Sequence, residues 1–174
     1  MTRAARAAAE ADEPVEHVVA LLRERLYGAI SCLATLAVLA RYTTEETSAW
    51  ARILDVAVAT GGLWAASLLA DWVAHLAVYS TAPRGRKALR MLQSSGQILQ
   101  AAVLPIAVLA VAGFDALDTD TATWIAGWVL VGELGVIALL AVRRTQLPWW
   151  QQALTVAGLT GVGALVLGIK ILAH

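Results

Sequence analysis

The chain has 174 residues, of which 59% are hydrophobic and 15% are charged, and its mean hydropathy is +0.68. Soluble domains are about 45–50% apolar and about 25% charged, so this composition argues against an ordinary soluble domain. The charges are clustered between long apolar runs, which predicts an all-α, polytopic membrane protein. The formal net charge is zero, and nothing in it suggests a nucleic-acid partner.

The N-terminal segment, residues 1–14, is polar and contains acids where a secretory signal peptide would have an apolar core. We therefore expect a short disordered tail here, followed by a helical membrane domain over residues 15–174. Pro14 is favourable in a first helical turn and places a helix start at Val15.

Five apolar stretches predict membrane-spanning helices, since a crossing needs about 20 residues. They cover about 22–40, 53–79, 89–114, 123–142 and 149–173. The first is the shortest, with 14 residues between Leu26 and Arg41, and it crosses only if Arg23 and Arg25 extend to the lipid headgroups. The alternative is four crossings, with the first apolar run lying flat on the membrane.

The segments between these stretches alternate in charge, which predicts the orientation of the chain. The segment after the second stretch is basic, and that after the third has Asp115, Asp118 and Asp120 and no base. Arg143 and Arg144 follow the fourth stretch. By the positive-inside rule, the N-terminus and the basic segments are cytoplasmic. The bases expected to contact anionic lipid headgroups are Arg84, Arg86, Lys87 and Arg90.

Ionisable residues lie inside the predicted spans. Asp71 and His75 are four residues apart and share one helix face, and Glu133 lies in the fourth span. At the α-helical rise, Asp71 and Glu133 lie about 13 and about 15 Å from the cytoplasmic edge. A charge at mid-bilayer costs at least ~2.5 kcal/mol, so we expect both acids to share a sheltered polar interior that binds a proton or a cation, with His75 as a relay.

Two further patterns concern the third and fifth spans. Gln93, Gln97 and Gln100 recur on one helix face in the cytoplasmic half of the membrane, and we expect this stripe to line the wet side of the same interior. In the fifth span, small residues recur at every fourth position. This row allows two helices to approach closely, within the chain or between subunits; its members are Thr160, Ala164 and Gly168.

Enzymatic and cofactor chemistry is not indicated. The sequence has no GxSxG, HExxH, CxxC or P-loop motif. His17, His75 and His174 are too far apart to suggest a pair of haem ligands. The spacing of the intramembrane acids and His75 is not distinctive of a metal site. We therefore expect no catalytic residues, no metal and no cofactor.

Two stretches carry a resemblance to known proteins: "LWAASLLADWVAHL" in the second span and the ending "VLGIKILAH". They resemble small integral membrane proteins of high-GC actinobacteria, a group with no established activity. The resemblance implies a multi-pass protein of the bacterial cytoplasmic membrane, and it assigns a role to no residue.

Two functions follow as hypotheses. The first is a homo-oligomer that passes protons or small cations through Asp71, His75 and Glu133, since a chain this small has little room for a conduit of its own. The alternative is a non-conducting scaffold or accessory subunit, whose buried polar residues only fix helix packing. In both cases the lipid bilayer is the expected partner.

Overall fold

The computed structural model describes residues 3–42, 47–143, 145 and 148–172, and over these residues it contains five α-helices and no strand. Each predicted apolar stretch corresponds to one helix, so the predicted all-α fold is confirmed. The helices are α1 (Arg3–Tyr42), α2 (Ala49–Tyr79), α3 (Arg86–Gly113), α4 (Thr119–Val142) and α5 (Trp149–Leu172).

Four helices are long and apolar enough to cross a membrane: α2, α3, α4 and the Trp149–Gly168 part of α5. These helices fit a multi-pass membrane protein. The first helix is not among them, because Arg23, Glu24 and Arg25 interrupt its apolar run. A crossing by α1 therefore remains a prediction.

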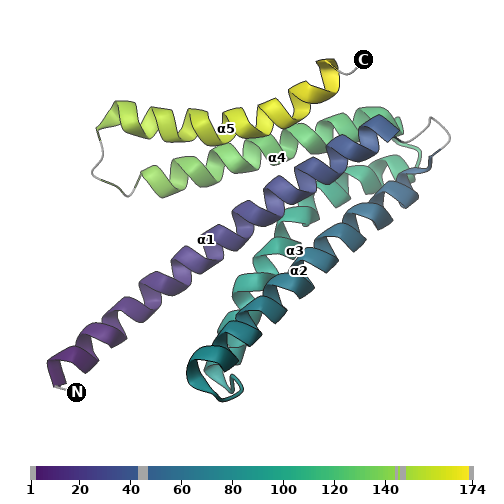
Figure 1. Cartoon of the computed structure of the whole chain (residues 1–174). Helices are drawn as coiled ribbons and strands as arrows, with labels where there is room; N and C mark the ends of the chain where they lie inside the picture. The colour runs from purple at the N-terminus through teal and green to yellow at the C-terminus, as the bar shows by residue number, and fades with distance from the viewer. Residues whose placement is uncertain (1–2, 43–46, 144, 146–147, 173–174) are drawn as a thin grey trace.

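The helices form two hairpins, α2–α3 and α4–α5, which meet at one end of the molecule and diverge toward the other (Figure 1). Helix α1 lies across the opening between the hairpins and contacts all four of the other helices. Its inner face is fully buried at Ala29, Leu33 and Leu36. This position favours a role for α1 inside the bundle over one flat on the membrane surface.

Four helices, α1 to α4, begin earlier than the predicted spans, and the difference is clearest in α1 and α4. Helix α1 extends back through Pro14 to Arg3 instead of starting at Val15, and its first residues are rich in alanine, the residue with the highest helix propensity. Helix α4 begins at Thr119 because Asp118 caps it, accepting hydrogen bonds from the backbone N–H groups of Asp120 and Thr121 at 3.1 and 3.0 Å.

The core lies between α1, α3 and α4, and close backbone approach shapes it. A Cβ atom on Gly28 of α1 would lie 2.8 Å from Ile98 Cα and 2.9 Å from Ile98 O on α3. Such distances are shorter than van der Waals contact, so the two backbones can be this close only where α1 has a glycine. The large apolar side chains of the buried core include Leu33, Leu36, Leu109, Leu130 and Leu134.

Candidate functional site

Three consecutive charged residues of α1 lie at the centre of the candidate site. Because successive helical residues point about 100° apart, Arg23, Glu24 and Arg25 reach different neighbours. Glu24 is 5% exposed, and the side chain of Arg25 is 30% exposed. A crossing by the first span was predicted only if Arg25 extends to the headgroups, and in the structure Arg25 has a partner within the bundle.

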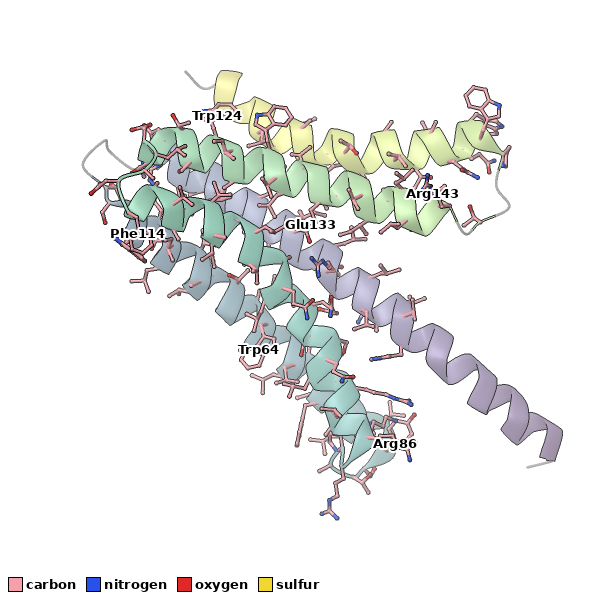
Figure 2. The ribbon with its side chains drawn as sticks, turned by 180° about the vertical axis from the view of Figure 1, so that it is seen from behind. Trp64, Arg86, Phe114, Trp124, Glu133 and Arg143 are labelled. Atoms are coloured by element: carbon pink, nitrogen blue, oxygen red, sulfur yellow. The ribbon has the colours of Figure 1, made fainter. Side chains whose placement is uncertain are left out.

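Arg25 connects three helices. Its Nη2 lies 2.7 Å from Glu133 Oε1 on α4, and its Nε donates a hydrogen bond to the same oxygen at 2.8 Å. Its Nη1 donates to Gln100 Oε1 on α3 at 3.1 Å. The Glu133 side chain, placed near the middle of α4 in Figure 2, is only 8% exposed. A carboxylate and a guanidinium thus compensate one another inside the bundle.

Glu24 makes a second connection, toward α2. Its Oε2 accepts a hydrogen bond from Ser67 Oγ at 2.8 Å, and its Oε1 lies 3.0 Å from Arg23 Nη2. Ser67 lies one helical turn before Asp71 on α2. Glu24 and Arg25 therefore point from neighbouring positions of α1 to opposite sides, one toward α2 and the other toward α3 and α4.

Asp71 and Glu133 are not brought together. In the part of the chain that the structure describes, no hydrogen bond or ion pair joins Asp71 to either Glu133 or His75. Asp71 is half-buried and lines two cavities next to Arg23. Arg25 of α1 supplies the partner of Glu133, and one polar interior shared by both acids stays a prediction.

His75 is buried, with its ring stacked at 4.5 Å on the ring of Tyr79 one turn further along α2. This position gives the imidazole an aromatic neighbour and no described contact with either acid. The role of a proton relay stays a prediction.

The three glutamines of the stripe differ in their contacts. Gln93 and Gln100 are exposed and Gln97 is half-buried, and Gln100 accepts the hydrogen bond from Arg25. The buried face of α3 is formed by other residues, among them Ser94, Ser95, Ile98 and Ala101. Of the three glutamines, Gln100 alone has a described bond to the charges of α1.

The row of small residues in α5 lies against α4 over part of its length. Thr160, Ala164 and Gly168 are all half-buried, and a Cβ on Gly135 of α4 would lie 3.1 Å from Thr160 Oγ1. A Cβ on Gly168 would meet nothing within 4 Å. The row thus packs within the chain at Thr160 and is open at Gly168.

The predicted headgroup bases lie around the connection between α2 and α3. Arg84, Arg86 and Lys87 are exposed and Arg90 is half-buried. The Lys87 ammonium lies 3.9 Å from the centre of the Tyr79 ring, a cation–π contact that holds the side chain beside the end of α2. The predictions on Arg144 and His174 concern residues outside the described part.

Sequence reasoning missed Arg52, in the first turn of α2. Its side chain is 1% exposed, lies 2.8 Å from Asp120 Oδ1 and donates to Thr123 Oγ1 at 2.8 Å. Arg52 lies within four positions of the start of α2, where a basic residue is ordinarily expected to face the membrane–water interface. No pattern in the sequence linked it to the acidic segment after α3. Nearby, the backbone N–H of Thr121 donates to Asp118 and lowers the pKa of that carboxyl below its ordinary range.

Comparison with known proteins gave no match: no protein-family model, no curated protein and no solved structure matches the chain. The described residues contain no group of three or more His, Cys, Asp and Glu side chains placed to hold a metal ion. The chemistry available to the site is that of compensated charge pairs between helices, and of one carboxyl, Asp71, that faces cavities.

Proposed function

We propose that this chain is a non-enzymatic scaffold or accessory subunit of the bacterial cytoplasmic membrane, in which charge pairs between helices fix the packing of the bundle. The ion pair of Arg25 and Glu133 carries the proposal, because it joins α1 to α4 and reaches α3 through Gln100. The four apolar helices fit a membrane location. The alternating basic segments and the actinobacterial resemblance support the choice of membrane.

The electrostatics favour a structural role for Glu133. An arginine does not lose its proton in proteins, so a cation arriving at Glu133 would have to compete with a guanidinium 2.7 Å away. The other buried charges are compensated in the same way, Glu24 by Arg23 and Ser67, and Arg52 by Asp120. Interhelical pairs of this kind fix which helix faces meet, a role that buried polar groups have in several proteins.

A double-mutant cycle tests this proposal. Removing one member of a buried ion pair costs roughly 3–5 kcal/mol; because the Arg25 side chain is 30% exposed, we expect about 2–4 kcal/mol for Arg25→Gln or Glu133→Gln alone. The double variant should lose less than the sum, with a coupling of about 1–3 kcal/mol. The measurement is thermal or denaturant unfolding in detergent, followed by circular dichroism.

The control is Arg143→Gln, which removes an exposed arginine at the end of α4 and should leave stability within about 0.5 kcal/mol. If the losses from Arg25→Gln and Glu133→Gln simply add, the pair does not hold the helices and the scaffold proposal loses its main support.

A second candidate is the passage of protons or small cations by a homo-oligomer. The observation that favours it is that Asp71 lines two cavities of about 420 and about 380 Å³ and has no hydrogen bond or ion pair among the described residues. A carboxyl beside a cavity can exchange a proton with water there. His75 and Glu133 would continue the path, the glutamines at 93, 97 and 100 would line its wet side, and subunit contacts would complete the conduit.

Flux measurements separate the two candidates. For a conducting protein, Asp71→Asn and Glu133→Gln should reduce proton or cation flux into proteoliposomes, while size-exclusion chromatography shows the same oligomer as for the wild type. For a scaffold, the wild type itself should give the flux of protein-free vesicles. Equal flux in wild type and Asp71→Asn proteoliposomes excludes passage through Asp71.

A further inference from the structure

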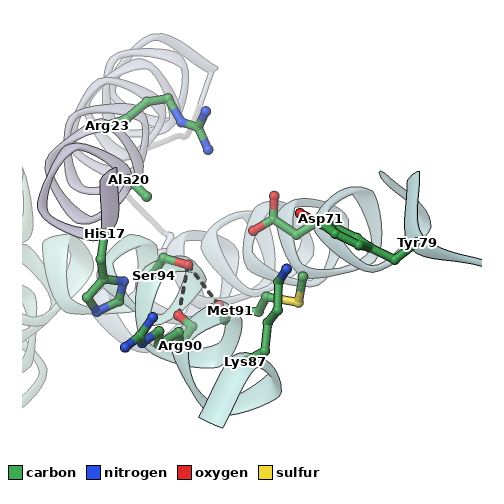
Figure 3. A pocket seen from close by; sticks show the side chains of 9 residues that line it. All are labelled: His17, Ala20, Arg23, Asp71, Tyr79, Lys87, Arg90, Met91 and Ser94. Atoms are coloured by element: carbon green, nitrogen blue, oxygen red, sulfur yellow. Dashed lines mark hydrogen bonds between the residues drawn. The ribbon is translucent and has the colours of Figure 1, made fainter. Parts of the chain in front are cut away.

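The cavity next to Asp71 lies where three helices reach the basic side of the molecule. It has a volume of about 420 Å³ and is bordered by α1, by the last turns of α2 and by the first turns of α3. Figure 3 shows side chains from all three helices around it, with Arg23 and Lys87 on opposite sides. Tyr79 ends α2 and Lys87 lies in the first turn of α3, so the cavity is at the depth expected for lipid headgroups.

Cations dominate the lining of this cavity. Arg23, Lys87 and Arg90 contribute guanidinium and ammonium groups, and His17 adds an imidazole, against the one carboxylate of Asp71. Lys87 is held in place by the Tyr79 ring at 3.9 Å. Because Arg23 is also paired with Glu24, the excess positive charge comes from Lys87 and Arg90. It complements an anion, above all a phosphate group, which accepts several hydrogen bonds from such side chains.

A second cavity of about 380 Å³ continues from the first between α1 and α2. Arg23 and Asp71 line both cavities, which places the two side by side. The remaining wall of the second is mainly apolar, from Leu63, Ala66, Ala70 and Ile98, together with Tyr27, Glu24 and Ser67. A cationic cavity next to an apolar one matches the structure of a phospholipid, in which a charged phosphate adjoins apolar acyl chains.

Part of α2 has exposed apolar surface that such a molecule could cover. The buried residues of this helix are Ala49, Arg52, Val56, Thr60 and His75, so no residue between Thr60 and His75 is fully buried by the rest of the chain. Leu69, Trp72 and Val73 in this length are 64%, 40% and 61% exposed. An acyl chain lying along this part of α2 would cover apolar surface that the protein itself leaves open.

We propose that this site binds one anionic phospholipid, with its phosphate in the cationic cavity between Arg23 and Lys87 and an acyl chain in the groove between α1 and α2. This inference goes beyond the scaffold function and does not depend on it. Lys87 and Arg90 bind the phosphate as charge-assisted donors. Asp71 opposes it by like-charge repulsion and thereby limits the affinity.

Native mass spectrometry of the full chain in detergent tests the site, with phosphatidylglycerol and phosphatidylcholine added in equal amounts. We expect one phosphatidylglycerol to be retained in preference to phosphatidylcholine. Lys87→Gln should weaken its retention about fivefold, the effect of one basic residue close to the phosphate. Asp71→Asn should strengthen it, because the repulsion is removed.

Arg86→Gln is the matched control. Arg86 precedes Lys87, carries the same charge and is exposed, yet it does not line the cavity, so its replacement should change retention less than twofold. Equal losses for Lys87→Gln and Arg86→Gln would overturn the proposal, since they would show diffuse attraction to a basic surface. Equal retention of both lipids would also overturn it.

A third arm distinguishes a lipid from a soluble phosphate. Glycerol 3-phosphate has the phosphate and no acyl chain, so it should neither be retained nor displace phosphatidylglycerol at equal concentration. Displacement by glycerol 3-phosphate would show a soluble-anion site and overturn the assignment to a lipid. Unfolding curves of all variants should overlay that of the wild type, and a destabilised Lys87→Gln is replaced by Arg90→Gln, another base that lines the cavity, in the same comparison.

Discussion

Arg52 and Asp120 form an ion pair whose two members differ in exposure. The arginine is 1% exposed, whereas the side chain of Asp120 is 57% exposed. Water therefore solvates the acid when the arginine is removed, but nothing replaces the acid when Asp120 is removed. Arg52 Nε already has no hydrogen-bond partner among the described residues, so the guanidinium depends on Asp120 and Thr123.

We predict that the two members of this pair respond differently to mutation. Asp120→Asn, which leaves a buried guanidinium with less compensation, should destabilise the protein by about 1–3 kcal/mol. Arg52→Met keeps most of the buried volume and leaves a solvated carboxylate, so it should cost less than Asp120→Asn. Denaturant unfolding in detergent measures both. A larger loss for Arg52→Met would show that packing of the arginine, and not its charge, is what matters.

Asp118 gives the protein a predictable response to acid. Its folded pKa is lowered, chiefly by the hydrogen bond from the backbone N–H of Thr121. The charged cap therefore contributes stability above the unfolded aspartate pKa of about 3.9, and this stability is lost as the pH falls through the lower folded pKa. Asp118→Asn keeps a neutral cap and removes only the charge.

The prediction is that the wild type melts at a higher temperature than Asp118→Asn at pH 6, and that the gap closes as the pH falls below about 4. Melting temperatures from pH 3 to pH 7 provide the measurement. A gap independent of pH would mean that the charge of Asp118 does not stabilise α4.

At the scale of elements, the contact of α1 with α3 rests on one residue without a side chain. The atoms that a Cβ on Gly28 would meet are the backbone of Ile98, and a backbone cannot rotate aside as a side chain can. We predict that Gly28→Ala forces α1 away from α3 and costs about 1–3 kcal/mol, the usual cost of overpacking.

The control is Gly62→Ala in α2, where a Cβ would meet nothing within 4 Å and alanine has the higher helix propensity. This variant should be as stable as the wild type or more so. Thermal unfolding compares the two, and equal stability of both alanine variants would contradict the close approach.

Helix positions could be predicted from the sequence far better than helix ends and helix partners. Long apolar runs define the five helices, because hydrocarbon excludes charges over the length of a crossing. The start of α4 was placed too late, although the cap was readable in the order Asp118, Thr119, Asp120. The sequence does not distinguish Gly28 from Gly62, because the difference lies in a neighbouring helix.

The candidate site could be predicted only in part, for a similar reason. The sequence marked Glu133 and Gln100 as candidate site residues, and both contact Arg25, Glu133 with a buried side chain and Gln100 at an exposed position. It did not identify that partner, because spacing along one helix defines a face but does not say which helix that face meets. The two acids at equal depth suggested a pair with each other, whereas the described partner of Glu133 is Arg25 of α1.

At the scale of the whole molecule, the arrangement predicts which loops face the same side of the membrane. The connection between α2 and α3 and that between α4 and α5 lie at the diverging end, opposite the connection between α3 and α4 (Figure 1). By the positive-inside rule, the basic residues of the diverging end predict that this end is cytoplasmic.

Thiol labelling of intact cells tests this topology. In a Cys32→Ala background, Asp115→Cys should react with a membrane-impermeant maleimide in intact cells, and Thr81→Cys should react only after the cells are permeabilised. Cys32 is the one cysteine of the sequence, so this background has no native thiol that could react. The opposite pattern of labelling would reverse the orientation and contradict the positive-inside prediction.

The divergence of the two hairpins also gives the molecule a tapered outline, narrow where the acidic connection lies and broad at the basic end (Figure 1). A tapered protein in a bilayer occupies a larger cross-sectional area in one lipid monolayer than in the other. The monolayer at the broad end must spread to accommodate it, so the bilayer around the protein bends with that monolayer on its convex side. The chain should therefore partition toward membrane regions that already have this curvature.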